Sequence, residues 1–275
     1  MEKYKYKTVF ISDLHLGTEG SRADLLLHFL KSINCEHLYL VGDVIDGWRL
    51  QNSWYWPEEH QDVIDYIAQK AKNGLDVKLL PGNHDDFLRN PRYQAYIPDY
   101  IDYNEEFIYE AINGKKYLVL HGDQVDEVIR KAKWLAKVGD WAYRVAIIIN
   151  RGFNLIRRAF GLKYWSLSLH LKQFVKRLAT RNRFEKNLTK MAIERNLDGI
   201  IAGHSHRPMI KQYNGVTYMN DGDWVESLSA LVEHYDGRFE IILWDKELNI
   251  GRHELEHMRR KGIKPNLPIW GENGV

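Results

Sequence analysis

The sequence predicts an α/β protein with one mixed sheet or two packed sheets. Short apolar, β-branched segments alternate with amphipathic helical segments in the first part of the chain, and consecutive strand-like segments follow near its end. This order is typical of sheets that carry helices on their faces. Five of the strand-like segments run directly into Asp, Asn or His residues. With 275 residues, of which 44% are hydrophobic, the chain can bury a substantial core.

The individual elements follow from hydrophobic spacing. The segment Lys7-Thr-Val-Phe-Ile11 is short and β-branched, which predicts a buried strand. Apolar residues recur at helical spacing between Ser21 and Ile33 and again between Pro57 and Gly74, so two helices are predicted there. Further strands are predicted at residues 37–41, 77–80, 117–120, 199–202, 216–219, 228–233 and 239–243.

A block of 68 residues, from Val128 to Arg195, differs from the rest of the chain in charge. It has 17 Lys and Arg against three acids, whereas the remainder has 22 against 34. The block contains no proline, and its apolar residues recur at helical spacing. We therefore expect a basic, amphipathic helical cap at residues 128–195, inserted into a core formed by residues 1–127 and 196–258, with a mobile tail at 259–275.

Composition also bears on the compartment. The single cysteine, Cys35, cannot form an intrachain disulfide, and the N-terminal residues lack the apolar stretch of a signal peptide. The best apolar run, Val145 to Ile149, is five residues long, against the roughly 20 that a membrane span needs. We expect a soluble, cytoplasmic protein.

Chemistry is concentrated where the predicted strands end. In open α/β sheets, ligands bind at the carboxyl ends of strands, so these residues are expected to converge if the strands are neighbours. An isolated Asp-x-His is common, and a lone histidine is more often structural, but the ordered set is specific for a metal site. The set is Asp13-x-His15, Gly42-Asp43-x-x-Asp46, Gly82-Asn83-His84-Asp85, His121-Gly122-Asp123 and Gly203-His204-Ser205-His206.

The donor types indicate which metal. Imidazole nitrogens together with carboxylate and amide oxygens suit Mn, Fe, Zn, Co or Ni better than Mg or Ca, and no thiolate is available in the set. Clustered carboxylates must be neutralised, and there are more donors than one catalytic ion needs. Two divalent ions that share a carboxylate are therefore expected.

In these five motifs, the sequence resembles the calcineurin-like metallophosphoesterase superfamily over residues 9–206. The resemblance implies an αββα sandwich of two mixed sheets flanked by helices, and a two-metal centre. One ion would be held by Asp13, His15, Asp43 and His206, and the other by Asp43, Asn83, His121 and His204. His84 would face the substrate phosphate as a catalytic residue.

A mechanism follows as a hypothesis. The ions lower the pKa of a water molecule for attack on phosphorus, while His84 balances charge and protonates the leaving oxygen. Asp85 is expected to orient the His84 ring. Asp46 and Asp123 are equally well explained as partners of ligand histidines or as turn and helix-cap acids.

The substrate is less well defined by sequence. A basic cap with interleaved Trp and Tyr suits a lipid-linked polyanion at a membrane surface or a nucleic acid, and many basic helix faces are merely solvated. The sequence resembles the UDP-2,3-diacylglucosamine pyrophosphatases of lipid A synthesis in the order of its motifs, in the segment from Gly203 to Pro208 and in the helical insertion. It differs from them at His84, where the best-known enzymes of that family have arginine. Residues Trp48 to Trp56 also resemble a sister subfamily. Trp48, Arg49 and Arg207 are candidate substrate-binding residues.

These observations lead to one principal interpretation and two alternatives. The principal one, which the resemblance to the pyrophosphatases implies, is a Mn²⁺-dependent hydrolase that cleaves UDP-2,3-diacylglucosamine to UMP and 2,3-diacylglucosamine 1-phosphate at the cytoplasmic face of the inner membrane. Its partners would be the lipid-linked nucleotide and a transient anionic membrane surface, with no obligate protein partner. The alternatives are a phosphodiesterase or nuclease, and a non-catalytic membrane- or nucleic-acid-binding module that keeps a metal site.

Overall fold

A computed structural model describes residues 4–125, 184–251 and 254 of the chain. The chain divides into two compact units, one formed by residues 1–123 and 191–275 and the other by residues 124–190. The predicted tail at 259–275 and most of the predicted cap at 128–195 lie outside the described residues. The last part of that cap segment is described, and it belongs to a helix, α8 (Phe184–Glu194).

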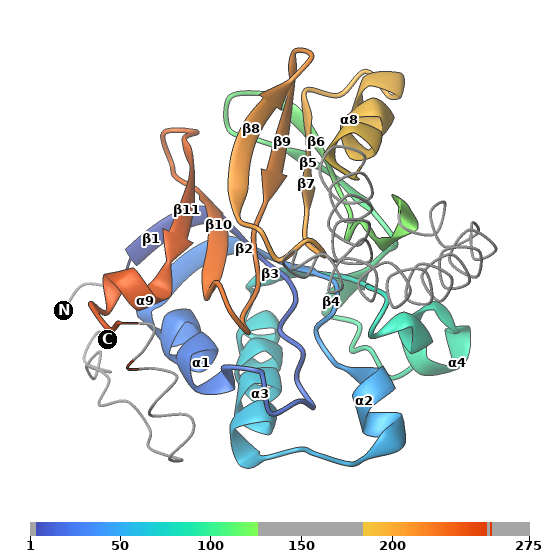
Figure 1. Ribbon diagram of the computed structural model, residues 1–275, viewed down its shortest axis with the longest axis vertical. Helices are drawn as coiled ribbons and strands as arrows, with labels where there is room; N and C mark the ends of the chain where they lie inside the picture. Colours follow the sequence, from blue (N-terminus) through green and yellow to red (C-terminus); the bar gives the residue numbers. More distant parts are fainter. Residues whose placement is uncertain (1–3, 126–183, 252–253, 255–275) are drawn as a thin grey trace, which may run out of the picture. The chain divides into compact units, whose positions relative to one another are not determined.

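The first unit contains a six-stranded mixed sheet (Figure 1). The four strands β1 to β4 pair in parallel. Two strands from later in the chain follow on the other side of β1, where β10 pairs antiparallel with β1 and β11 pairs antiparallel with β10. Their order is β11 (Phe239–Leu243), β10 (Ser229–Glu233), β1 (Tyr4–Ile11), β2 (Ile33–Val41), β3 (Asp76–Leu80) and β4 (Ile101–Tyr103).

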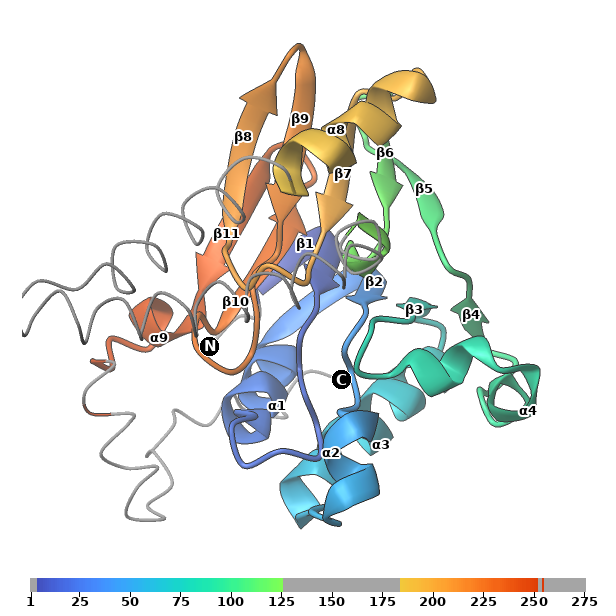
Figure 2. The same cartoon turned by 45° about the vertical axis from the view of Figure 1, so that its right-hand side comes forward.

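A second, five-stranded sheet completes the framework of this unit (Figure 2). Its central strand is parallel to both neighbours, and its two outer pairs are antiparallel. The order is β5 (Phe107–Glu110), β6 (Lys116–Val119), β7 (Gly199–Ala202), β9 (Val216–Asn220) and β8 (Met209–Tyr213).

The alternation of side chains along β1 shows how the layers pack. Val9 and Ile11 belong to a core shared with the helices α1 (Ala23–Ser32) and α3 (Glu58–Lys72), which cover one face of the first sheet. Phe10 points the other way, into a second core that includes Tyr117 and Ile201 of the second sheet. Successive strand residues face opposite sides, so one strand supplies both cores.

The predicted fold of two mixed sheets flanked by helices is thus confirmed. All eight predicted strands and both predicted helices are present. The short elements α2 (Gly47–Asn52), η1 (Asp86–Arg89), α4 (Pro91–Gln94) and α9 (Trp244–Glu247) occur in addition.

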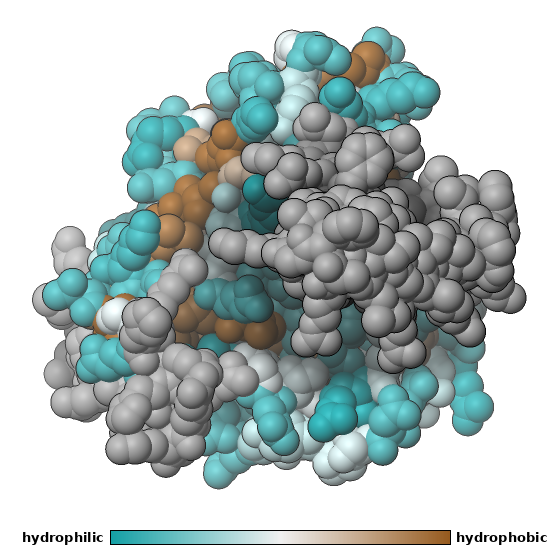
Figure 3. All heavy atoms as spheres, viewed as in Figure 1, coloured by the Kyte–Doolittle hydropathy of each residue, from teal (hydrophilic) through white to brown (hydrophobic). Residues whose placement is uncertain are grey.

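The described surface is mostly hydrophilic on the face seen in Figure 3, with a strip of hydrophobic side chains over β8 and β11. Within the described parts of the chain, none of the helices combines the length and the apolar character that crossing a bilayer requires.

Candidate metal centre

Backbone hydrogen bonds bring the strand ends together. The segment after β1 runs beside the segment after β2, because the N–H of Asp13 donates to the carbonyl of Gly42 and the N–H of His15 donates to that of Asp43, each at 3.0 Å. In the second sheet, the N–H of Gly203 donates to the carbonyl of His121 at 3.1 Å. The predicted convergence of the motifs is therefore built into the backbone.

The described side chains form three groups of metal-donor type, one of which joins His15 to Asp46 and His84. The other two consist of predicted ligands. Donor atoms of Asp13, His15 and His206 all lie within 4.8 Å of one another, and so do those of Asp43, His121 and His204. Asp43 connects the groups, since its Oδ2 atom lies 3.3 Å from Nε2 of His121 and 3.9 Å from Nε2 of His15. This is the position that a shared carboxylate would take between two ions.

Several of these residues adopt a strained backbone conformation. Asp13, His15, Asp43, His204 and His206 have φ between 46° and 63°, and they are five of the nine non-glycine residues with positive φ in the described chain. Such conformations cost about 1–3 kcal/mol each and persist where the surrounding structure enforces them, typically at functional sites.

The buried polar atoms fit cations. Oδ1 of Asp13, Nε2 of His15, Oδ1 of Asn83 and Nε2 of His121 are buried and find no hydrogen-bond partner among the described residues. The ring of His121 donates from Nδ1 to the carbonyl of Val41 at 2.8 Å, so a neutral ring presents a lone pair at Nε2. Unsatisfied buried donors and acceptors are rare, and lone pairs that face one another are expected around a metal ion.

The electrostatics show that the carboxylates require positive charge beside them, which a proton on His121 or an ion supplies. Burial opposes the ionisation of Asp13, but its contacts with His15 and His206 hold the pKa of Asp13 well below its ordinary value. Burial likewise opposes protonation of His121, yet the carboxylates of Asp43 and Asp13 raise the pKa of His121 to about 10. The centre therefore concentrates negative charge that cations can balance.

Gly42 shows why a residue without a side chain is needed between β2 and Asp43. Its φ is +85°, and a Cβ atom there would lie 2.4 Å from Nδ1 of His121. Only glycine accepts both the conformation and the close approach of the ring.

The predicted role of Asp85 needs a correction. Its carboxylate accepts hydrogen bonds from the backbone N–H groups of Gly82 at 2.6 Å and Val44 at 2.7 Å, and it thereby joins the loop after β3 to the loop after β2. The residue beside the His84 ring is Asp46, whose Oδ2 atom lies 3.0 Å from Nδ1 of His84. The same Oδ2 accepts a hydrogen bond from Nδ1 of His15 at 3.3 Å.

The three candidate substrate-binding residues differ in what they contact. Trp48 is 42% exposed, and its ring lies against the His84 ring with centroids 4.4 Å apart. Arg49 is exposed on α2, and Arg207 is exposed directly after His206. Trp48 is thus placed beside the predicted catalytic histidine, while Arg49 lies on α2 after Asp46, and Arg207 follows His206 in the chain.

Three buried residues around the centre were not among the predicted site residues. Ser12 lies 2.5 Å from Oδ2 of Asp13 through its Oγ atom, and Asp221 lies 2.7 Å from the same Oγ. Asp223 caps the following turn by accepting the N–H of Val225 at 2.8 Å, and its Oδ1 atom lies 3.9 Å from Nδ1 of His206. The usable signal was that Asn220-Asp221-Gly222-Asp223 follows a strand, as the other motifs do.

Asp123 has a structural partner. Its carboxylate pairs with the guanidinium of Arg89 at 3.1 Å, and Arg89 also donates to the carbonyls of Pro81 and Gly82. This arrangement ties the turn after His121 to the loop that carries Asn83.

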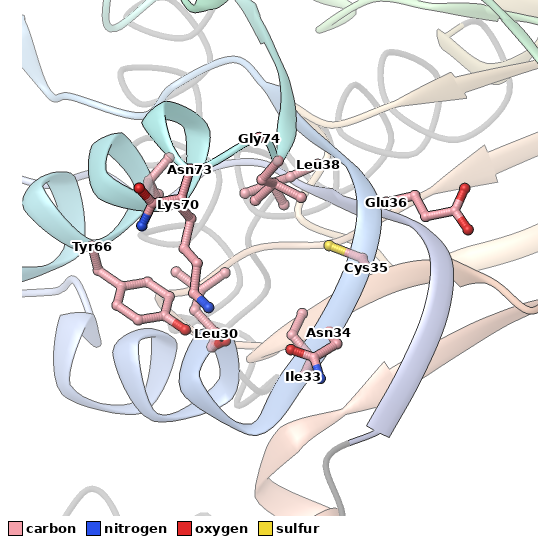
Figure 4. Close-up of a pocket in the computed structure, with 12 residues that line it drawn as sticks. Leu30, Ile33, Asn34, Cys35, Glu36, Leu38, Tyr66, Lys70, Asn73 and Gly74 are labelled. Carbon is pink, nitrogen blue, oxygen red and sulfur yellow. Dashed lines mark hydrogen bonds between the residues drawn. The ribbon is translucent and has the colours of Figure 1, made fainter. Parts of the chain in front are cut away.

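A separate pocket of about 440 Å³ lies at the opposite end of β2 from the metal centre (Figure 4). It is lined by residues between Leu30 and Leu38 and by the last turns of α3, including Tyr66 and Lys70. None of the predicted site residues lines it.

Comparisons with known proteins can now be set beside this geometry. Residues 6–208 match the sequence profile of the calcineurin-like phosphoesterases. The UDP-2,3-diacylglucosamine hydrolase of Blochmanniella pennsylvanica (strain BPEN) is 28% identical over 211 residues, which cover 74% of this chain and 80% of that protein. The hydrolase of the same name from Xanthomonas campestris pv. campestris (strain B100) is 28% identical over 255 residues, covering 84% and 96%. A solved archaeal phosphodiesterase aligns with 86% of this chain and 98% of its own, at 13% identity and a TM-score of 0.44.

The profile match and the relatives define the class of protein as a metal-dependent phosphohydrolase. The chain belongs to the calcineurin-like phosphoesterase family.

Proposed function

We propose that this protein hydrolyses the pyrophosphate bond of UDP-2,3-diacylglucosamine, releasing UMP and 2,3-diacylglucosamine 1-phosphate. The observation that carries the proposal is the pair of donor groups joined through Asp43, because two adjacent ions suit the displacement at a phosphoryl centre. Relatives that carry the hydrolase name match most of the chain and support the choice of substrate.

The donors divide into two sets around Asp43. We assign Asp13, His15, Asp43 and His206 to one ion, and Asp43, Asn83, His121 and His204 to the other. The mixture of imidazole nitrogens with carboxylate and amide oxygens favours Mn²⁺, and Fe, Zn, Co and Ni accept the same donors. When bound, such ions polarise phosphoryl oxygens and lower the pKa of water.

The chain's own residues supply positioning and proton transfer. Asp46 lies 3.0 Å from Nδ1 of His84 through its Oδ2 atom, and we assign it the role of orienting the ring so that Nε2 is left for the phosphate oxygens or the leaving oxygen. Trp48 covers the same ring and restricts its rotation. A positioned acid of this kind typically contributes about 10²–10⁴-fold to the rate.

A membrane-bound substrate agrees with the aromatic side chains that stand out from the described surface. Trp54 is 77% exposed and Tyr96 is 80% exposed. Trp and Tyr are favoured where an apolar acyl region meets water, since each ring has a polar edge. We place the protein in the cytoplasm, in transient contact with the anionic cytoplasmic face of the inner membrane.

The test compares the lipid substrate with bis-p-nitrophenyl phosphate, using metal-free protein to which Mn²⁺ is added back. We expect Mn²⁺-dependent release of UMP, and a loss of about 10²–10⁴-fold in His84→Ala at unchanged metal content. His37→Asn serves as the matched control, because His37 also pairs with a carboxylate, Asp76 at 2.8 Å, away from the site.

Two results would overturn the proposal, and a third would change the role of His84. Hydrolysis of the diester without the lipid substrate would favour the phosphodiesterase or nuclease alternative. Metal binding without turnover of either substrate would favour a non-catalytic binding module. Normal turnover in His84→Ala would remove His84 from the chemistry.

A further inference from the structure

A buried carboxyl group that the proposed chemistry does not use lies behind the first donor group. Asp221 is fully buried, and its Oδ1 atom lies 2.7 Å from the Oγ atom of Ser12. Its Oδ2 atom is buried without a hydrogen-bond partner among the described residues. Ser12 in turn lies 2.5 Å from Oδ2 of Asp13. The three side chains form a continuous row that ends at a proposed metal ligand.

The hydrogen atoms in this row can be counted. A serine hydroxyl has one hydrogen and can accept others. Both contacts, at 2.5 Å and 2.7 Å, have the length of a hydroxyl bound to a carboxylate. Asp13 also accepts the N–H of His204, whereas Oδ2 of Asp221 is buried with no partner among the described residues, so the charge belongs on Asp13 and the hydrogen of Ser12 points to it. The contact of Ser12 with Asp221 would then bring two oxygen lone pairs together at 2.7 Å unless Asp221 contributes the hydrogen.

We propose that Asp221 and Ser12 are a positioning pair for Asp13, in which Asp221 donates to Ser12 and Ser12 donates to Asp13. The inference rests on the proposed metal centre and adds two residues to it. In this arrangement the hydrogen bond from Ser12 fixes the Oδ2 atom of Asp13, and the Oδ1 atom would be available to the ion.

The surroundings of both carboxyl groups agree with this assignment. The Oδ2 atom of Asp13 also accepts the N–H of His204 at 2.8 Å, whereas its Oδ1 atom faces another predicted ligand, Nε2 of His206, at 3.0 Å. A hydrogen on Asp221 also explains the buried and unpartnered oxygen of that residue, because a charged carboxylate there would be costly. The turn itself is fixed, since Ser229 donates to the carbonyl of Asp221 at 2.8 Å.

The test measures the affinity of the metal-free protein for Mn²⁺ by calorimetry, together with thermal unfolding of the metal-free state. Ser12→Ala and Asp221→Ala should each weaken binding at one site by about 10–100-fold, as expected for partners of a ligand. Because the two residues act in series, the double variant should lose no more Mn²⁺ affinity than the single variant with the larger loss.

Asp221→Asn separates the hydrogen from the charge. An amide can still donate to Ser12, so this variant should bind Mn²⁺ nearly as well as the wild type. Ser32→Ala is the matched control, because it removes a buried hydroxyl that donates to the carbonyl of His28 within α1, and its affinity should equal that of the wild type.

The outcomes are distinguishable. Additive losses in the double variant, or a loss in Asp221→Asn as large as in Asp221→Ala, would show that Asp221 acts through its charge and would overturn the inference. Unchanged affinity in Ser12→Ala would also overturn it, even if Asp221→Ala fails to fold. A wild-type protein that binds no Mn²⁺ would instead defeat the proposed function.

Discussion

The Oδ2 atom of Asp46 lies 3.0 Å from the Nδ1 atom of His84, at the point where the loops after β2 and β3 meet. The same oxygen accepts a hydrogen bond from His15, and the other oxygen of Asp46 accepts the N–H of Arg49 at the start of α2. One carboxylate therefore caps a helix, accepts a hydrogen bond from a proposed ligand and lies beside a proposed acid.

Asp46→Asn tests this arrangement. Asparagine keeps an oxygen to cap α2 but replaces the charged acceptor shared by the two histidines, so we expect turnover to fall by about 10–100-fold while the fold is retained. The measurement is kcat together with Mn²⁺ affinity and the far-UV circular dichroism spectrum. Asp62→Asn, on an exposed position of α3, is the control. Wild-type kcat in Asp46→Asn would mean that His84 needs no partner.

Gly82→Ala tests the packing beneath the shared carboxylate. A Cβ atom at residue 82 would lie 2.2 Å from Oδ1 and 2.6 Å from the backbone nitrogen of Asp43, so the bridge residue must move. We expect a loss of Mn²⁺ binding and a fall of about 1–3 kcal/mol in the free energy of unfolding, as in other overpacked sites. Gly251→Ala is the control, since nothing lies within 4 Å of its Cβ position. Equal behaviour of the two variants would argue against a rigid centre.

The sequence was a good guide to elements with a strong hydrophobic pattern. The buried strands β2 and β7 have consecutive apolar residues and were predicted. β8 was not predicted, because three of its five residues are exposed and Lys and Gln interrupt the pattern. β4 has three residues and depends on pairing with β3 rather than on its own composition.

The same limit applies to the centre. Asp13, His15 and Asp43 could be predicted because each directly follows a strand that is recognisable in the sequence. The contact between Ser12 and Asp221 joins residues 209 positions apart, and no local pattern specifies it. The carboxylate of Asp85 is occupied by backbone N–H groups from two loops, so the residue beside His84 is Asp46. Only the folded chain brings these two loops together.

The third prediction concerns stability in acid. His60 is buried and accepts the N–H of Gly17 at 2.9 Å through Nδ1, with the rings of Tyr55 and Trp56 against it. Burial lowers the pKa of His60 below 6.5, although the charge of Glu59 opposes the shift. The unfolded chain therefore binds a proton that the folded chain does not, and stability falls as pH drops from about 6.5 toward the lowered folded pKa.

Urea unfolding at pH 7.5 and 5.5 of the wild type and His60→Asn measures this contribution. Asparagine can accept the N–H of Gly17 but cannot titrate, so the wild type should lose more stability than the variant over that interval. The difference is at most about 1.4 kcal/mol per pH unit. Parallel losses in both proteins would show that other groups cause the acid lability.

The last prediction concerns the pocket at the start of β2. Burial raises the pKa of Cys35 from 9.0 to about 12, although the charge of Lys70 opposes the shift. Figure 4 shows both side chains among those that line the pocket. Only the thiolate is nucleophilic, so the shift should slow alkylation of the folded protein roughly a thousandfold relative to the unfolded chain. The measurement is the rate of modification by iodoacetamide at pH 7.5, with and without urea. Similar rates in the two states would mean that the pocket admits enough water to ionise the thiol.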